Sequence, residues 1–184
     1  MDQPTSNEDL MTAVRDGHLE ALAALFERHH RPLFGYARGR SGDTDRAEDV
    51  VQETFSRILR YRRSYRPGAP FVPWMLRIAR NVLQAEGAQS PDLALTAAAE
   101  VKASDDPVRD LERKQRREQV MAGLAELAEE DRDLLLLSHV QELPRQEIAH
   151  MLGITTNAAK VRIHRALATL RRQIVGADHG EAKS

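Results

Sequence analysis

The chain has 184 residues, enough for one large domain or two small ones, and its 27 Lys and Arg nearly balance 28 Asp and Glu, giving a formal net charge of −1. It contains no cysteine, which excludes a disulfide scaffold, a thiol nucleophile and a cysteine zinc site. No apolar run reaches the roughly 18 residues of a membrane span, and the polar, acidic N-terminus is unlike a signal peptide. We therefore expect a cytoplasmic chain with no membrane insertion.

Apolar residues recur at helical spacing along most of the chain, and no convincing alternating strand pattern occurs, so we predict an all-α fold. Ser6 and Asp9 are typical of a capping box that opens a first helix, and Gly17 marks the turn after it. A second helix is expected from residue 19 to 38, where Pro32 should kink or divide it. Further helices are expected at 45–60, 71–85, 108–127 and 131–140.

The predicted organisation is two small helical domains joined by a flexible acidic linker. Residues 87–107 are rich in Gly, Ser, Pro and Ala, and acidic residues outnumber basic ones around them. We therefore place one domain at 1–86, the linker at 87–107, a helix-turn-helix domain at 108–176 and a disordered tail at 177–184.

The stretch from residue 54 to 85 contains no carboxylate but combines basic and aromatic side chains. Its arginines are Arg57, Arg60, Arg62, Arg63, Arg66, Arg77 and Arg80. Guanidinium groups that track a backbone and rings that stack on bases suit an opened, single nucleic-acid strand. Phe55 is expected in the core and Trp74 either in the core or against a base, whereas Tyr61 and Tyr65 in the loop are better candidates for base contact.

The stretch from Leu134 to Ile174 is typical of a helix-turn-helix that ends in a basic helix. Pro144 suits the start of a helix, Gly153 suits a tight turn, and Thr155 or Thr156 can cap the next helix. No Asp or Glu occurs from residue 148 to 177, and five basic residues lie there: Lys160, Arg162, Arg165, Arg171 and Arg172. A helix with one buried side and otherwise positive charge suits the major groove of DNA, although a plain amphipathic helix has a similar pattern.

These residues resemble a known family. Two blocks resemble the larger domain of bacterial sigma factors: AEDVVQETF at 47–55 and FVPWMLRIARN at 71–81. A third, EIAHMLGITTNAAKVRIHRAL at 147–167, resembles their C-terminal DNA-binding region. With two domains alone, the chain resembles the extracytoplasmic-function (group IV) class. The resemblance implies a sigma factor, monomeric within the holoenzyme, that binds core RNA polymerase, directs it to promoters and assists promoter opening.

The resemblance also implies site residues and partners. Core polymerase should contact Asp49, Gln52 and Glu53. The melted −10 strand should contact Tyr61, Arg62, Arg63, Tyr65, Arg66, Trp74, Arg77, Arg80 and Asn81. The −35 duplex should contact Thr156, Asn157, Lys160, Arg162, His164 and Arg165. An anti-sigma factor is a further implied partner, and no enzymatic activity, cofactor or metal is expected.

The sequence departs from the family pattern after Asn81, where an aspartate and paired arginines are common. Here no basic residue follows before Lys102, so −10 recognition should be weaker or differently specified. Three other functions are considered: a helix-turn-helix regulator that acts without polymerase, an adaptor that mimics a sigma factor, and an enzyme. The enzyme's best acid-base or metal groups are His29, His30 and Glu27, or the pair Asp49 and Glu53, but adjacent histidines on one helix point about 100° apart.

Overall fold

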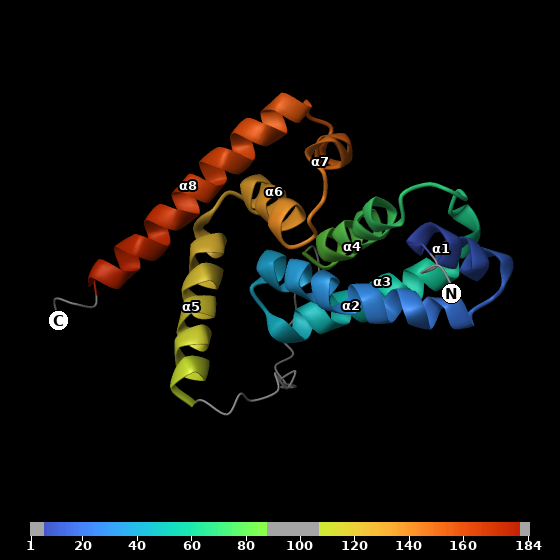
Figure 1. Ribbon diagram of the computed structural model, residues 1–184, viewed down its shortest axis with the longest axis horizontal. Coiled ribbons are helices and arrows are strands. Elements are labelled where there is room, and N and C mark those ends of the chain that lie inside the picture. Colours follow the sequence, from blue (N-terminus) through green and yellow to red (C-terminus); the bar gives the residue numbers. More distant parts are fainter. Residues whose placement is uncertain (1–5, 88–106, 181–184) are drawn as a thin grey trace, which may run out of the picture. The chain divides into compact units, whose positions relative to one another are not determined.

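Every regular element in the described part of the chain, residues 6–87 and 107–180 of the computed structural model, is a helix (Figure 1). The all-α prediction is therefore confirmed for these residues. The chain divides into two compact units, Met1–Ala94 and Leu95–Ser184, as expected for two small helical domains. Nearly all of the predicted linker lies outside the described residues.

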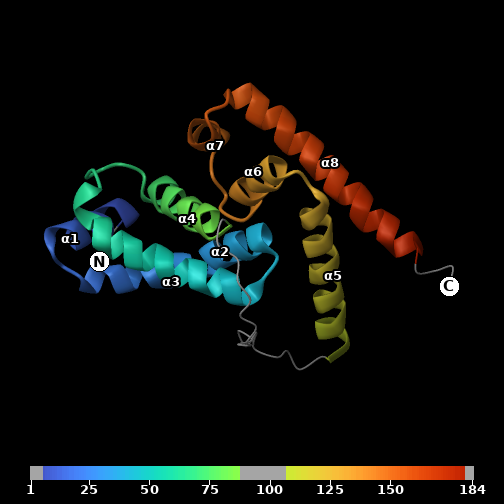
Figure 2. The same cartoon turned by 180° about the vertical axis from the view of Figure 1, so that it is seen from behind.

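The first unit contains α1 (Asn7–Asp16), α2 (Glu20–Ser41), α3 (Thr44–Tyr61) and α4 (Phe71–Gly87), with a 3-10 turn, η1 (Arg62–Ser64), after α3. Helix α3 packs against α2 and α4, and α1 packs against α2, η1 and α4 (Figure 2). The apolar positions that recur along these helices form the core, whose largest fully buried side chains are Met11, Leu25, Leu33, Tyr36, Ile58, Tyr65, Phe71, Met75 and Leu76.

Helix ends in this unit follow the chemistry of their sequence. The Ser6 hydroxyl accepts from the Asp9 N–H at 3.0 Å, and the Asp9 carboxylate accepts from the Ser6 N–H at 3.3 Å, so the predicted capping box is confirmed. Asp43 caps α3 by accepting from the Arg46 N–H at 3.0 Å. Helix α2 continues through Pro32 to Ser41, so this proline does not divide the helix, and the alternative of a kink stays a prediction.

The second unit contains α5 (Pro107–Glu126), α6 (Glu129–His139), α7 (Arg145–Leu152) and α8 (Thr156–Gly180). Helix α8 packs against the other three. Buried leucines from α6 form the centre of the core together with Ile148 from α7 and Ala159, Ile163, Ala166 and Leu170 from α8. Gly123 lets α5 approach α8, because a Cβ there would lie 2.7 Å from the Leu170 side chain.

The turn between α7 and α8 confirms the predicted helix-turn-helix signals. Gly153 closes α7 in the left-handed conformation, at φ 66°, and the Thr155 hydroxyl caps α8 by accepting from the Ala158 N–H at 3.1 Å. Residues 177–180, predicted as part of a disordered tail, continue α8 instead. The rest of that tail, 181–184, lies outside the described residues.

Candidate nucleic-acid interface

One side of α8 is exposed along its first three turns. The exposed residues recur at positions i, i+1, i+4 and i+5, as expected for one side of a helix, and are Thr156, Asn157, Lys160, Val161, His164 and Arg165. We call these six residues the α8 stripe. Ala159, Ile163 and Ala166 are buried on the other side of the helix. The core packing of α8 therefore leaves the stripe free to meet a partner.

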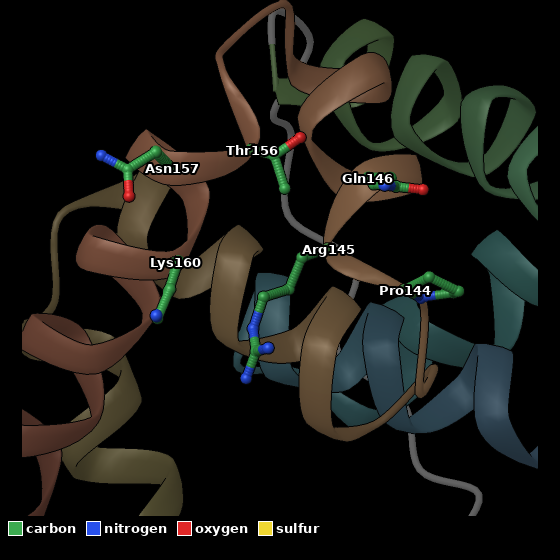
Figure 3. A pocket seen from close by; sticks show the side chains of 6 residues that line it. All are labelled: Pro144, Arg145, Gln146, Thr156, Asn157 and Lys160. Atoms are coloured by element: carbon green, nitrogen blue, oxygen red, sulfur yellow. The ribbon is translucent and has the colours of Figure 1, made fainter.

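A hollow lies where the amino ends of α7 and α8 meet (Figure 3). Pro144, Arg145 and Gln146 line it from the α7 end, and Thr156, Asn157 and Lys160 line it from the α8 end. The amino end of a helix carries partial positive charge, and Arg145 and Lys160 add full charges. This combination suits a phosphate group.

Three cations around this surface have no partner in the part of the chain that the structure describes. Within residues 6–87 and 107–180, the side chains of Arg145, Lys160 and Arg165 make no ion pair or side-chain hydrogen bond. An exposed cation without a carboxylate partner keeps its charge available to an external anion, such as a DNA phosphate.

Arg162 differs from these cations, although it was predicted to contact the −35 duplex with them. Its guanidinium donates two hydrogen bonds to Asp131 Oδ1, at 3.0 and 2.8 Å, and one to Glu130 Oε2 at 2.8 Å. The hydrogen bond to Asp131, then that to Glu130, raises the pKa of Arg162 above its ordinary value. Because these bonds join α8 to the first turn of α6, Arg162 has an internal role, and its predicted contact with the −35 duplex stays a prediction.

The predicted strand-binding loop after α3 combines exposed and buried residues. Tyr61 is 51% exposed, and Arg63 and Arg66 are exposed as well, so their side chains are accessible to a nucleic-acid strand. Arg62 is half-buried and donates to the Leu59 carbonyl at 2.9 Å.

Tyr65 corrects the prediction for this loop. It is 2% exposed, its hydroxyl donates to the Ala69 carbonyl, and its ring lies 5.2 Å from that of Trp74 in an edge-on arrangement. Burial, and to a smaller degree the charge of Glu8, raises the pKa of Tyr65 to about 12, so the phenol stays protonated. The prediction that Tyr65 presents its ring to bases is therefore wrong.

Helix α4 carries the remaining predicted −10 residues. Arg77 and Asn81 are exposed and lie one turn apart, whereas Arg80 is half-buried. Trp74 is also half-buried, with its ring against Tyr65 and 6.4 Å from Phe71. The core interpretation of Trp74 thus holds in part, and its contact with a base stays a prediction.

The predicted polymerase-binding residues lie on α3. Asp49 and Gln52 are exposed. Glu53 is half-buried, and its carboxylate accepts from Arg57 Nε at 2.6 Å. Asp49 and Gln52 therefore have accessible polar groups, while Glu53 is engaged within its own helix.

Three residues of the interface were missed by sequence reasoning. Arg145 and Gln146 lie outside the carboxylate-free run, next to Glu147, and their proximity to α8 depends on the turn. Val161 is 39% exposed in the middle of the α8 stripe. Val161 lies between two charged residues in the sequence, and the prediction considered only the charges. However, it lies four residues from both Asn157 and Arg165, and this helical spacing places it on the same side of α8 as they are.

The described residues contain no group of three or more His, Asp or Glu side chains placed to hold a metal ion. None of the helices in the described ranges is long and apolar enough to cross a membrane. The His29 and His30 rings lie against different partners, Phe71 at 5.2 Å and Phe26 at 5.0 Å respectively.

Comparison with known proteins identifies both units. The family Sigma-70 region 2 matches residues 25–86, and the family Sigma-70, region 4 matches residues 117–170. The sigma factor CarQ of Myxococcus xanthus is 31% identical over 170 residues, which cover 88% of this chain and 93% of CarQ. The ECF sigma factor SigE of Mycolicibacterium smegmatis is 30% identical over 176 residues, covering 90% of this chain and 68% of SigE.

A solved structure has the same fold. CnrH, determined in complex with the cytosolic domain of CnrY, is 24% identical, and the match covers 97% of this chain and 99% of CnrH with a TM-score of 0.69. The matches to both sigma regions, in order along one chain, decide against a helix-turn-helix regulator that acts without polymerase. The chain belongs to the sigma-70 family and, within it, to the ECF RNA polymerase sigma factors.

Proposed function

We propose that this sigma factor reads duplex DNA at −35 with the α8 stripe and the amino end of α7. The observation that carries the proposal is a set of three exposed cations, Arg145, Lys160 and Arg165, which lie beside an exposed row of polar side chains and have no ion-pair partner among the described residues. Asn157 has a donor and an acceptor that can read base edges, and the cations Arg145, Lys160 and Arg165 suit DNA phosphates.

Val161 adds an apolar contact to this reader. In the major groove, thymine presents a C5 methyl group that no other base carries, and apolar side chains read it by direct contact. A valine in the middle of a polar and cationic row is suited to that methyl group. We therefore assign Val161 to a thymine in the −35 element.

The first unit supplies polymerase docking and strand opening. Asp49 and Gln52 on α3 offer an acidic and an amide group to a basic partner surface. Tyr61, Arg63 and Arg66, with Arg77 on α4, present one aromatic ring and several positive charges, which suits capture of the opened −10 strand.

The remaining assignments follow from the family resemblance. The chain contributes promoter recognition and strand opening but no chemistry of its own, and it acts in the cytoplasm as a single copy within the holoenzyme. An anti-sigma factor holds it inactive until an inducing signal arrives.

In vitro transcription with purified core polymerase on a genomic DNA library tests the proposal. We expect new transcription start sites to depend on the chain, with a shared −35 and −10 sequence upstream. A variant with Asp49→Ala and Gln52→Ala should bind core polymerase more weakly, whereas Lys160→Ala with Arg165→Ala should keep that binding and lose the start sites. A chain that joins core polymerase in no stoichiometric complex, or joins it without adding start sites, would refute the proposal.

A further inference from the structure

Helix α4 starts without an acceptor of its own. Pro70 stands immediately before it, where a Ser, Thr, Asp or Asn side chain would normally accept a hydrogen bond from the first turn. The first turn of α4 also carries no acidic residue. The partial positive charge at this helix end thus has no local compensation.

The acceptor comes from α1, the first helix of the unit, which packs against α4. Glu8 lies in the first turn of α1, and its Oε1 accepts from the Phe71 N–H at 3.0 Å, across 63 residues of sequence. The Glu8 carboxylate therefore supplies both the hydrogen bond and the negative charge that the start of α4 lacks.

The residues around this contact form a packed cluster. Phe71 is fully buried and its ring lies against that of His29. Tyr65 is buried against Trp74, and α1 packs directly on η1 and on α4. The segment between the two anchors, residues 66–70, is therefore held at one end by Tyr65 and at the other by Glu8.

We propose that Glu8 is a positioning residue for promoter opening: by capping α4 it fixes the segment 66–70, which joins η1 to α4 and presents Arg66 to the melted strand. This inference rests on the proposed function of that segment. Glu8 touches no DNA; it acts through Phe71 and the geometry of the loop. Loss of the cap should slow strand opening and leave both −35 binding and polymerase binding unchanged, because those surfaces lie on α8 and α3.

The test uses the holoenzyme on a promoter found in the library experiment. Strand opening is followed by the fluorescence of 2-aminopurine placed in the −10 element, and −35 binding is measured separately with a duplex that lacks the −10 element. Glu8→Ala should slow opening by about twofold to thirtyfold, the range that corresponds to loss of a helix cap. Its affinity for the −35 duplex should stay within about twofold of wild type, a margin below the effect of one typical hydrogen bond.

Two further variants separate capping from other effects. Glu27→Gln is the matched control, since Glu27 is exposed on α2 and is not among the residues assigned to polymerase or DNA binding; it should open promoters at the wild-type rate. In Glu8→Ala/Pro70→Asp, an aspartate directly before α4 places a carboxylate at the same helix end, where it can accept from the Val72 N–H and compensate the helix dipole, and opening should recover. A merely structural role of Glu8 within α1 would not be rescued from residue 70.

Each outcome decides the matter. Opening by Glu8→Ala at the wild-type rate, or equal losses in opening and in −35 binding, would overturn the inference. If Glu8→Ala does not fold, the double variant decides: recovery of folding and opening supports the cap, and failure of either overturns it. A wild-type holoenzyme that opens no promoter would overturn the proposed function together with this inference, whereas normal opening by Glu8→Ala overturns this inference alone.

Discussion

Arg162 and Arg165 lie three residues apart on α8, and their replacement by alanine should affect different properties. Arg165→Ala should weaken DNA binding, whereas Arg162→Ala should lower the stability of the second unit. Arg165 is exposed and has no ion pair within the described residues, so it is available to a DNA phosphate. Each phosphate contact contributes about −0.9 to the slope of log affinity against log salt concentration. Arg165→Ala should therefore flatten that slope by about 0.9, and the double variant with Lys160→Ala by about 1.8.

Arg162→Ala should instead destabilise the second unit. The guanidinium makes three hydrogen bonds to Asp131 and Glu130, but its side chain is 33% exposed and those of the carboxylates are 34% and 79% exposed. Water therefore screens much of the attraction, and we expect a loss of about 1 to 2 kcal/mol in the free energy of unfolding. In a domain of this size, that corresponds to a melting temperature lower by roughly 4 to 16 °C.

Two measurements on the same proteins check the contrast. Fluorescence anisotropy of a labelled −35 duplex with holoenzyme, at several salt concentrations, gives the slope, and calorimetry of the free chain gives the melting temperature. Asp131→Asn is the partner control and should reproduce the loss of stability without changing the slope. The reasoning fails if Arg162→Ala flattens the slope while the melting temperature stays the same.

Two further predictions concern Val161 and His29. Replacing one −35 thymine by deoxyuridine should weaken wild-type binding by about 0.8 kcal/mol, roughly fourfold, and should not affect Val161→Ala; equal sensitivity of both proteins at every thymine would refute the assignment. Burial, and then the charge of Arg28, lowers the pKa of His29 below 6.5, so the unfolded chain binds more protons than the folded chain as pH falls through 6.5. The free energy of unfolding of the first unit should therefore be constant above about pH 7.5 and fall towards pH 5 by up to about 1.4 kcal/mol per pH unit. Denaturant titrations at several pH values measure this dependence. His29→Gln should flatten it, and an unchanged slope in that variant would refute the role of His29.

The helices and their caps were predictable because their causes are local. Burial on one side of a helix repeats every three to four residues, and Ser6, Gly153 and Thr155 act on N–H groups or dihedral angles within a few positions of themselves. The same periodicity identified the buried side of α8 and so implied the exposed one.

The contacts that were not predicted are those in which a side chain meets a residue far away in the sequence. Tyr65 lies in a loop rich in Pro and Gly, and nothing local indicated that it packs on Trp74. Arg162 belongs to a carboxylate-free run, yet the carboxylates that bind it lie 31 and 32 residues earlier. Glu8 caps a helix 63 residues later. Such contacts depend on the angles between packed helices, which hydrophobic periodicity does not encode.

The internal pairing of Arg162 also explains how a chain of net charge −1 can present a positive surface to DNA. The first turn of α6 carries Glu129, Glu130 and Asp131, whose field would oppose an approaching phosphate. Arg162 binds two of these carboxylates and balances part of their charge, whereas Lys160 and Arg165 lie on the exposed side of the same helix. Because the field at a surface depends on the placement of charges more than on their sum, near-neutrality of the whole chain is compatible with electrostatic binding by α8.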